Sequence, residues 1–293
     1  MVPERIQLLL AGAILASAVP GHAQSEAPPG GFSRIVSLNP DFTQSLVDLG
    51  AGNRLAGITR FCPAVTGART VGDLREIDAE AVLALNPDLV LATRTGNFRE
   101  SVDALRRLGL PVRIVERPRT LDQFEDYLRE MGALSGREEA AEILCRRLDR
   151  QREIFRKRAQ NGPRPRVFFE LDDYPVYFSV GKETMIGELI GVCGGINVCE
   201  GLGEPYPSLD AEQVVALAPD VVVVSIMGTN GEAAVRRWLD SGLVPAARRG
   251  RVYRVDPDLV CRLGAGLLEG MRELAECIHP EWSPAGEDGG GEE

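Results

Sequence analysis

Two segments of the chain carry almost the same sixteen residues. Residues 77–92 read IDAEAVLALNPDLVLA, and residues 209–224 read LDAEQVVALAPDVVVV, 132 positions later. Solenoid repeats recur about every 20–50 residues. A single second copy at this much longer distance therefore predicts two halves of the molecule that are built alike.

Both halves alternate short apolar segments with amphipathic helical ones. Alternation of this kind is typical of βαβ units and parallel sheets. The first half contains the expected strands 34–38, 54–59, 88–93 and 112–116. The second half contains the expected strands 166–171, 220–225 and 251–256.

The segment between the halves reads differently. Residues 121–160 show helical periodicity without a strand signal, with one soft interruption at 134–136. The stretch after this interruption predicts a helix of about 24 residues, about 36 Å long. We therefore expect an α/β fold of two Rossmann-like lobes joined by one long α-helix, with a cleft between the lobes where small ligands usually bind.

The expected segments follow from these patterns. A signal peptide (1–23) precedes an N-terminal lobe (33–118), a connecting helical segment (119–162), a C-terminal lobe (163–280) and a disordered acidic tail (281–293). In the signal peptide, Arg5 precedes an apolar run. Gly21 and Ala23 are small residues at the two positions that a signal peptidase reads before the predicted cut. The alternative is a membrane anchor, but the run is shorter than the roughly 20 residues that span a bilayer.

Composition excludes several functions. A net charge of -10 argues against binding of nucleic acid, which needs a basic footprint. After the predicted cut the chain retains one histidine, His279, so an imidazole-rich metal site cannot form. The chain has no GxSxG or HExxH motif. We therefore expect no enzyme, and a secreted hydrolase or chelatase remains a remote alternative.

Several segments in the same order resemble a known family. They are residues 34–50, 91–97, 179–198, 204–214 and 258–262. Together they are similar to the substrate-binding proteins of ABC importers with a rigid helical backbone, which bind cobalamin, haem or ferric siderophores, and most of all to the cobalamin binders. The resemblance implies a monomeric periplasmic receptor without an intrinsic cofactor. It would capture a corrinoid or another small metal chelate and deliver it to an ABC importer permease.

The resemblance places the ligand site on loops at the strand ends that face the cleft. The implied ligand-binding residues are Arg60, Phe61, Thr93, Arg94, Asn97, Tyr174, Tyr177, Phe178, Tyr206, Asp258 and Arg262. Aromatic faces suit a flat macrocycle because they bury large apolar areas. Three alternatives stay open: Phe61 packs in the core, Tyr206 is part of a rigid turn, or Asp258 and Arg262 pair with each other.

One departure bears on the ligand. Where the cobalamin receptors use tryptophans, the matching positions here are Leu74, Thr93 and Tyr206. The two tryptophans of the chain, Trp238 and Trp282, fall on a predicted helix and in the C-terminal tail. A pocket with fewer indoles favours a different corrinoid or another chelate.

The resemblance also implies a docking role for one glutamate in each lobe. Glu80 and Glu212 occupy equivalent places in the repeated segments, at the start of each helix. Paired carboxylates on two lobes can meet arginines of a two-fold symmetric permease. The alternative is that each glutamate only stabilises its helix N-terminus, by about 0.3–1 kcal/mol.

Six cysteines remain after the predicted cut, and fifteen pairings are possible. The resemblance implies a disulfide between Cys193 and Cys277. Cys62 and Cys261 fall on cleft-facing loops of opposite lobes. They are candidate metal ligands, a disulfide pair or inert thiols, and buried free cysteine is the commonest state.

Overall fold

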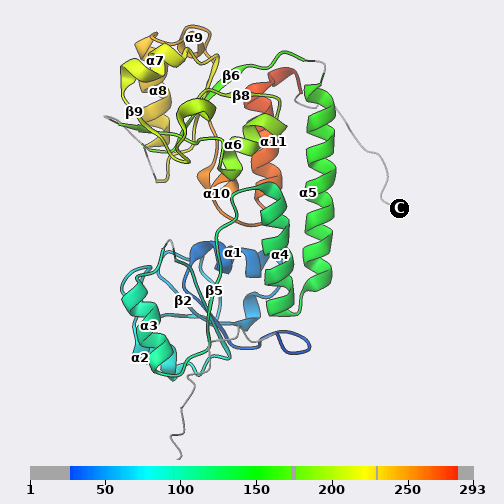
Figure 1. The fold of residues 1–293 in the computed structure, drawn as a ribbon, viewed down its shortest axis with the longest axis vertical. Coiled ribbons are helices and arrows are strands. Elements are labelled where there is room, and N and C mark those ends of the chain that lie inside the picture. The colour runs from blue at the N-terminus through cyan, green and yellow to red at the C-terminus, as the bar shows by residue number, and fades with distance from the viewer. Residues whose placement is uncertain (1–26, 95, 161, 173–175, 229, 283–293) are drawn as a thin grey trace, which may run out of the picture.

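The computed structural model describes residues 27–94, 96–160, 162–172, 176–228 and 230–282. The predicted signal peptide and the chain after Trp282 lie outside these ranges. Two α/β lobes lie one above the other, and one long helix, α5, runs along the same side of both (Figure 1). Within the described ranges, no helix has the length and apolar character needed to cross a membrane.

The N-terminal lobe is built on a five-stranded parallel sheet in the order β3-β2-β1-β4-β5. Its strands are β1 (Ile35–Ser37), β2 (Leu55–Ile58), β3 (Arg69–Thr70), β4 (Leu89–Ala92) and β5 (Val112–Ile114). Its helices are α1 (Pro40–Asp48), the 3₁₀ turn η1 (Gly52–Arg54), α2 (Ala79–Ala84) and α3 (Arg99–Arg107).

The C-terminal lobe has a four-stranded parallel sheet in the order β11-β10-β6-β8 and a small antiparallel pair, β7-β9. Its strands are β6 (Arg166–Glu170), β7 (Tyr177–Phe178), β8 (Ile196–Asn197), β9 (Ser208–Leu209), β10 (Val221–Val224) and β11 (Val252–Arg254). Its helices are α6 (Met185–Val192), α7 (Ala211–Leu217), α8 (Gly231–Ser241), α9 (Pro245–Arg248), α10 (Pro257–Val260), α11 (Leu267–Ile278) and the 3₁₀ turns η2 (Glu200–Leu202) and η3 (Pro280–Trp282).

The two large sheets share one topology. The order β2-β1-β4-β5 in the first lobe matches β8-β6-β10-β11 in the second. In each lobe the repeated segment forms a short helix, α2 or α7, followed by a central strand, β4 or β10. The prediction of two Rossmann-like lobes built alike is therefore confirmed.

The likeness extends to single side chains. The guanidinium of Arg34 donates to the carbonyl of Leu85 at the end of α2, and that of Arg166 donates to Leu217 at the end of α7. In each lobe the aspartate of the Pro-Asp pair accepts from the backbone N–H of this same arginine. The duplicated Pro-Asp thus fastens each repeated helix to the first strand of its sheet.

The connecting segment contains two helices. α4 (Leu121–Ser135) folds back against α5 (Glu138–Ala159), and the turn between them contains Gly136. Gly136 has φ of 58°, and a Cβ atom there would lie 2.1 Å from the carbonyl oxygen of Gly30. The predicted soft interruption is therefore a full reversal that only glycine fits. The long helix is confirmed as α5, and α4 packs beside it.

One apolar core runs through both lobes and the connecting helices. It includes Phe124 and Met131 of α4, Leu148 of α5, Leu189 of α6 and Leu274 of α11. Two smaller clusters fill the outer faces of the two sheets. Because the lobes share the largest cluster, moving one lobe against the other disturbs packed side chains.

A buried ion network reinforces this core. Arg152 of α5, with a side chain only 7% exposed, lies 3.0 Å from Glu125 of α4, 2.7 Å from Asp122 and 3.7 Å from Glu188. Glu188 on α6 also accepts a hydrogen bond from the N–H of Leu121. The network ties the helical hairpin to the C-terminal lobe, and breaking such a pair leaves a charge buried without its partner.

The C-terminal lobe extends slightly beyond its predicted end at residue 280. Trp282 stacks on His279 with ring centroids 4.0 Å apart and on Phe155 of α5 at 6.2 Å. The carbonyl of Trp282 accepts from Arg158. Residues 281 and 282 therefore belong to the folded lobe.

The repeat contains one local difference that can be tested. The residue before the Pro-Asp pair has φ of 44° in both copies, and it is Asn86 in the first copy but Ala218 in the second. A left-handed conformation costs a residue such as alanine roughly 1–2 kcal/mol, whereas asparagine and glycine tolerate it. We predict that Ala218→Asn or Ala218→Gly stabilises the protein by about 0.5–1 kcal/mol, after allowance for unfolded-state entropy.

Urea unfolding measures this change. As a control, Ala133→Gly replaces an exposed alanine of α4 and should cost about 1 kcal/mol, since its backbone is helical. If Ala218→Gly is as destabilising as Ala133→Gly, the backbone at position 218 is not strained.

Candidate functional site

The two lobes are joined directly by a hydrogen-bonded contact between α1 and the loop 261–265. The hydroxyl of Ser45 donates to the carbonyl of Leu263 at 2.6 Å. The N–H of Leu263 donates to Asp41 at 3.2 Å, and the N–H of Ala265 donates to Asp48 at 2.6 Å. We call this contact the interlobe tie. It fastens helix α1 of the first lobe to the segment between α10 and α11 of the second.

Two further side chains complete the interlobe tie. The phenol of Tyr127, on α4, lies 2.9 Å from the hydroxyl of Ser45, and burial raises the pKa of Tyr127, so that it stays a neutral phenol. Arg117 pairs with Asp41 and donates to the carbonyl of Cys261. Residues from both lobes and the connecting segment thus meet in one polar cluster.

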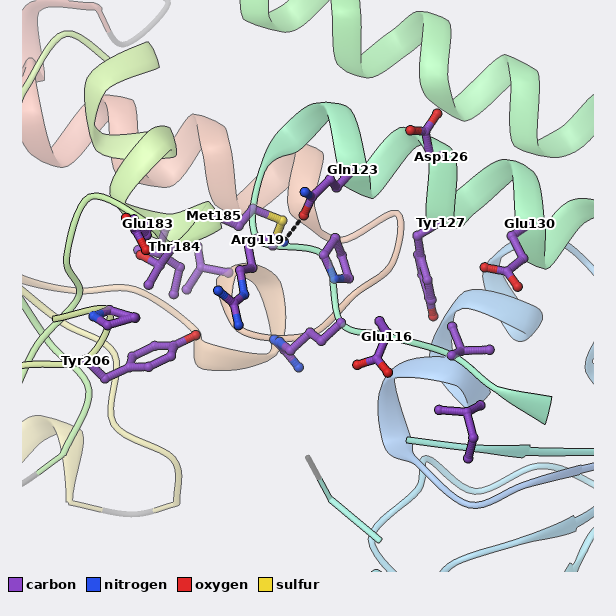
Figure 2. Close-up of a pocket in the computed structure, with 17 residues that line it drawn as sticks. Glu116, Arg119, Gln123, Asp126, Tyr127, Glu130, Glu183, Thr184, Met185 and Tyr206 are labelled. Carbon is purple, nitrogen blue, oxygen red and sulfur yellow. Dashed lines mark hydrogen bonds between the residues drawn. The ribbon is translucent and has the colours of Figure 1, made fainter. Parts of the chain in front are cut away.

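A cavity of ≈ 980 Å³ lies next to the interlobe tie. Its walls come from the segment 114–119 that leaves β5, one face of α4, the start of α6 and the turn at Tyr206. Figure 2 shows Glu183, Thr184 and Tyr206 on the side of the C-terminal lobe, Tyr127 and Glu130 on the opposite side, and Arg119 between them. The cavity is large enough for a small-molecule ligand.

On the N-terminal lobe, the predicted residues of the strand-end loops are mostly exposed. Phe61 is 52% exposed, and the guanidinium of Arg60 lies over its ring at 4.9 Å while pairing with Asp73 at 2.9 Å. Arg94 pairs with Glu116, a cavity residue, at 2.8 Å. The exposure of Phe61 contradicts the alternative that it packs in the core.

Thr93 and Asn97 are buried instead. The amide group of Asn97 donates to the carbonyls of Leu38 and Leu74, and its oxygen accepts from the N–H of Thr93. Because both ends of the amide are engaged, Asn97 holds three loops in place. A direct contact between Asn97 and a ligand would require these bonds to break.

On the C-terminal lobe, the predicted aromatic residues divide into two groups. Tyr206 is 54% exposed and lines the cavity, and Phe178 is 41% exposed. Tyr177 is only 5% exposed and packs against Trp238 with centroids 5.1 Å apart. Tyr177 is therefore a core residue, contrary to a role in the cleft. Tyr174 lies outside the described residues.

Asp258 and Arg262 pair with each other. Arg262 donates to the carboxylate of Asp258 at 2.6 and 3.1 Å, across one turn that begins in α10. Asp256 caps α10 by accepting from the N–H of Asp258. The structure therefore shows the alternative in which Asp258 and Arg262 pair with each other. A ligand that binds one of these two side chains must compete with this ion pair.

The two cleft-loop cysteines have separate surroundings. The sulfur of Cys62 lies 3.2 Å from the hydroxyl of Thr59, and that of Cys261 lies 3.9 Å from the hydroxyl of Ser225. Burial raises the pKa of Cys261, which disfavours the thiolate that a metal requires. Among the described residues, no group of three or more histidine, cysteine, aspartate or glutamate side chains is arranged for a metal ion.

Cys193 and Cys277 are both buried and are free thiols in this structure. Burial raises the pKa of Cys193, and the nearby sulfur of Cys277 raises it further. The two residues are thus neighbours, and their disulfide stays a prediction.

The predicted docking glutamates occupy matching places. Glu80 and Glu212 are each the second residue of their helix, α2 or α7, and both side chains are exposed. The capping bonds in these helices come from Asp78 and Asp210. Neither glutamate makes the capping bond, so both carboxylates remain available to a partner.

Sequence reasoning missed the segment 114–119 as a wall of the cavity. It contributes Glu116, Arg117 and Arg119, and Figure 2 shows Arg119 reaching toward Tyr206. A signal was present, because this segment directly follows strand β5, where ligand sites of parallel sheets form. The Arg-Pro-Arg run at 117–119 also concentrates positive charge at that point.

Comparison with known proteins now identifies the family. The profile of the periplasmic binding proteins matches residues 35–259, which run from β1 through the connecting helices into α10 and leave out α11. The chain belongs to the periplasmic binding protein family.

Relatives of this periplasmic binding protein agree with its fold. It is 30% identical to an uncharacterized ABC transporter substrate-binding lipoprotein, YvrC, of Bacillus subtilis over 259 residues, covering 85% of this chain and 80% of the relative. It is 28% identical to a vitamin B12-binding protein of Yersinia pestis, covering 74% and 78%. A periplasmic heme binding protein from Pseudomonas aeruginosa superposes with a TM-score of 0.72 at 27% identity, covering 85% and 93%.

The interlobe tie predicts a measurable dependence on Asp41. Asp41→Ala removes the acceptor of the Leu263 N–H and the partner of Arg117, and should lower the free energy of unfolding by about 1–3 kcal/mol. Hydrogen exchange at Leu263 should also become faster. Asp103→Ala, which removes only long, partly exposed ion pairs within α3, should cost less than about 1 kcal/mol. Equal losses of unfolding free energy in the two variants, or an unchanged rate of hydrogen exchange at Leu263, would contradict the interlobe tie.

Proposed function

We propose that this periplasmic binding protein is exported, captures a small metal chelate between its lobes and delivers it to the permease of an ABC importer. The observation that carries the proposal is the cavity of ≈ 980 Å³ beside the interlobe tie. The exposed side chain of Tyr206 lines it, where its ring can cover an apolar ligand. The names of relatives that bind vitamin B12 or heme support the same ligand class.

The first candidate ligand is a corrinoid. The second is haem or a ferric siderophore, and Arg119 in the cavity lining supports a ligand that carries a carboxylate. Arg117 and Arg119 line the cavity, and Arg60 and Arg94 lie on neighbouring loops of the N-terminal lobe. Guanidinium groups bind carboxylates in a bidentate manner. Arg60, Arg94 and Arg117 already pair with Asp73, Glu116 and Asp41. A carboxylate of the chelate would therefore meet Arg119 without displacing an ion pair of the described residues.

Titration calorimetry with cobalamin, cobinamide, haem and ferric siderophores tests this proposal. We expect saturable binding of at least one of them. Tyr206→Ala and Phe61→Ala should each weaken it by about five- to thirtyfold, since each removes an aromatic face worth roughly 1–2 kcal/mol. Leu243→Ala, which truncates an exposed side chain outside the cavity, should leave the affinity unchanged. Absence of saturable binding to any of these chelates would refute the proposed function.

Docking on the permease is the second part of the proposal. Glu80 and Glu212 supply one exposed carboxylate from each lobe at equivalent positions. We expect Glu80→Lys with Glu212→Lys to abolish uptake through the permease while the affinity for the chelate stays unchanged. Glu100→Lys, another exposed first-turn glutamate on α3, is the matched control and should leave uptake intact. A loss of chelate affinity in the double variant would place these carboxylates in the binding site instead.

Export completes the proposal. A cut near Ala23 would leave Gln24 as the first residue, and an oxidising compartment permits the pairing of Cys193 with Cys277. Intact-mass spectrometry of the exported protein, with and without reductant, tests both. A mature mass that retains residues 1–23 would contradict the cut, and a mass that reduction does not change would contradict the disulfide.

A further inference from the structure

A second concavity lies on the C-terminal lobe and has a different character from the cavity between the lobes. Its volume is ≈ 500 Å³, and we call it the α6 groove. Its lining includes the glycines of α6, the end of α5, the segment 195–200 around β8 and the residues just before α4. It shares only Arg119 with the cavity between the lobes. The α6 groove is therefore a separate feature from the proposed chelate site.

Positive charge dominates the α6 groove. Arg119, Arg156, Arg164 and Lys182 line it from separate parts of the chain, against only two carboxylates, which leaves a surplus of two positive charges. Both carboxylates already have partners, since Glu188 faces Arg152 and the N–H of Leu121, and the other lies 3.6 Å from Lys182.

Two of the arginines have no acidic partner of their own. Within the described residues, neither Arg119 nor Arg156 forms an ion pair. Both side chains are exposed. Gly191 of α6 also lines the groove, and a Cβ atom there would have no other atom within 4 Å, so the groove is open at this point. The whole chain has a net charge of -10, so a surplus of positive charge in the α6 groove is a local exception. Binding of an anionic ligand would explain it.

The chemistry of the α6 groove selects among anions. An exposed guanidinium gains little from a single charge, because water screens each pair. An anion must therefore carry several charges and several acceptor oxygens to be held here. A phosphate group meets this requirement, with up to two charges and three acceptor oxygens, and arginine forks match its geometry. A lone carboxylate offers one charge and would be held much more weakly.

We propose that the α6 groove binds a phosphate-bearing anion, either a soluble phosphate compound or the headgroup of an anionic phospholipid. Arg156, in the last turn of α5, and Lys182, just before α6, bind the phosphate oxygens, and Arg164 donates to the carbonyl of Gly195. Arg119 lines both the α6 groove and the cavity between the lobes, whereas Arg156 and Lys182 line the α6 groove alone. This site adds a second ligand class to the surface of the C-terminal lobe.

The test uses the full mature chain at low salt, titrated with inorganic pyrophosphate by calorimetry. In parallel, sedimentation with vesicles of phosphatidylglycerol in phosphatidylcholine probes the lipid headgroup. The variant Arg156→Gln with Lys182→Gln removes two charges from the α6 groove, and thermal melting confirms its fold. The control, Arg107→Gln with Arg147→Gln, removes two exposed charges elsewhere.

We expect saturable binding of pyrophosphate that weakens about tenfold in the groove variant and by less than about twofold in the control. Binding of pyrophosphate without sedimentation on vesicles supports a soluble phosphate compound, and sedimentation that the groove variant abolishes supports a lipid headgroup. Absence of binding to both probes overturns the proposal. An equal loss in the control also overturns it, because net charge alone would then explain the binding.

Discussion

The hydrogen bonds between α1 and the loop 261–265 are the constraint on which the rest of the structure depends. A long helix along one edge, such as α5, leaves two lobes able to rock about its ends. Ser45 and Asp41 remove much of that freedom, because they bind the backbone of Leu263 directly and lie next to the cavity. The shared apolar core and the Arg152 network act in the same direction. The cavity between the lobes is therefore formed before any ligand arrives.

Duplication explains how two such lobes arise from one pattern. Each copy of the repeat places a short helix before the central strand of its sheet, and Arg34 or Arg166 fastens that helix in the same way. The same geometry sets Glu80 and Glu212 at equivalent points of α2 and α7. If the lobes cannot shift relative to each other, these two carboxylates also keep a fixed spacing. A fixed spacing suits docking on a symmetric partner.

The two lobes and the long helix could be predicted from the sequence, because they depend on local periodicity and on the repeated segment of sixteen residues. The sequence did not predict the reversal at Gly136, which depends on close contact with Gly30 far away in sequence. Tyr177 and Phe178 are adjacent and alternate in direction, so only the packing of Trp238 decides which of them is buried. The burial of Asn97 likewise depends on the loops at Leu38 and Leu74, which sequence alone does not bring together.

The most direct measurement is the distance between the lobes in solution, with and without ligand. Spin labels carried by unnatural amino acids at Leu83 of α2 and Ala216 of α7, both exposed, avoid the native cysteines. Double electron–electron resonance then gives the distance distribution in the presence of saturating cobalamin or zinc protoporphyrin. If the interlobe tie holds the lobes in place, the distance between the two labels should change by less than about 2 Å when the ligand binds. A larger shortening, as in hinge closure around a ligand, would show that the interlobe tie does not fix the lobes.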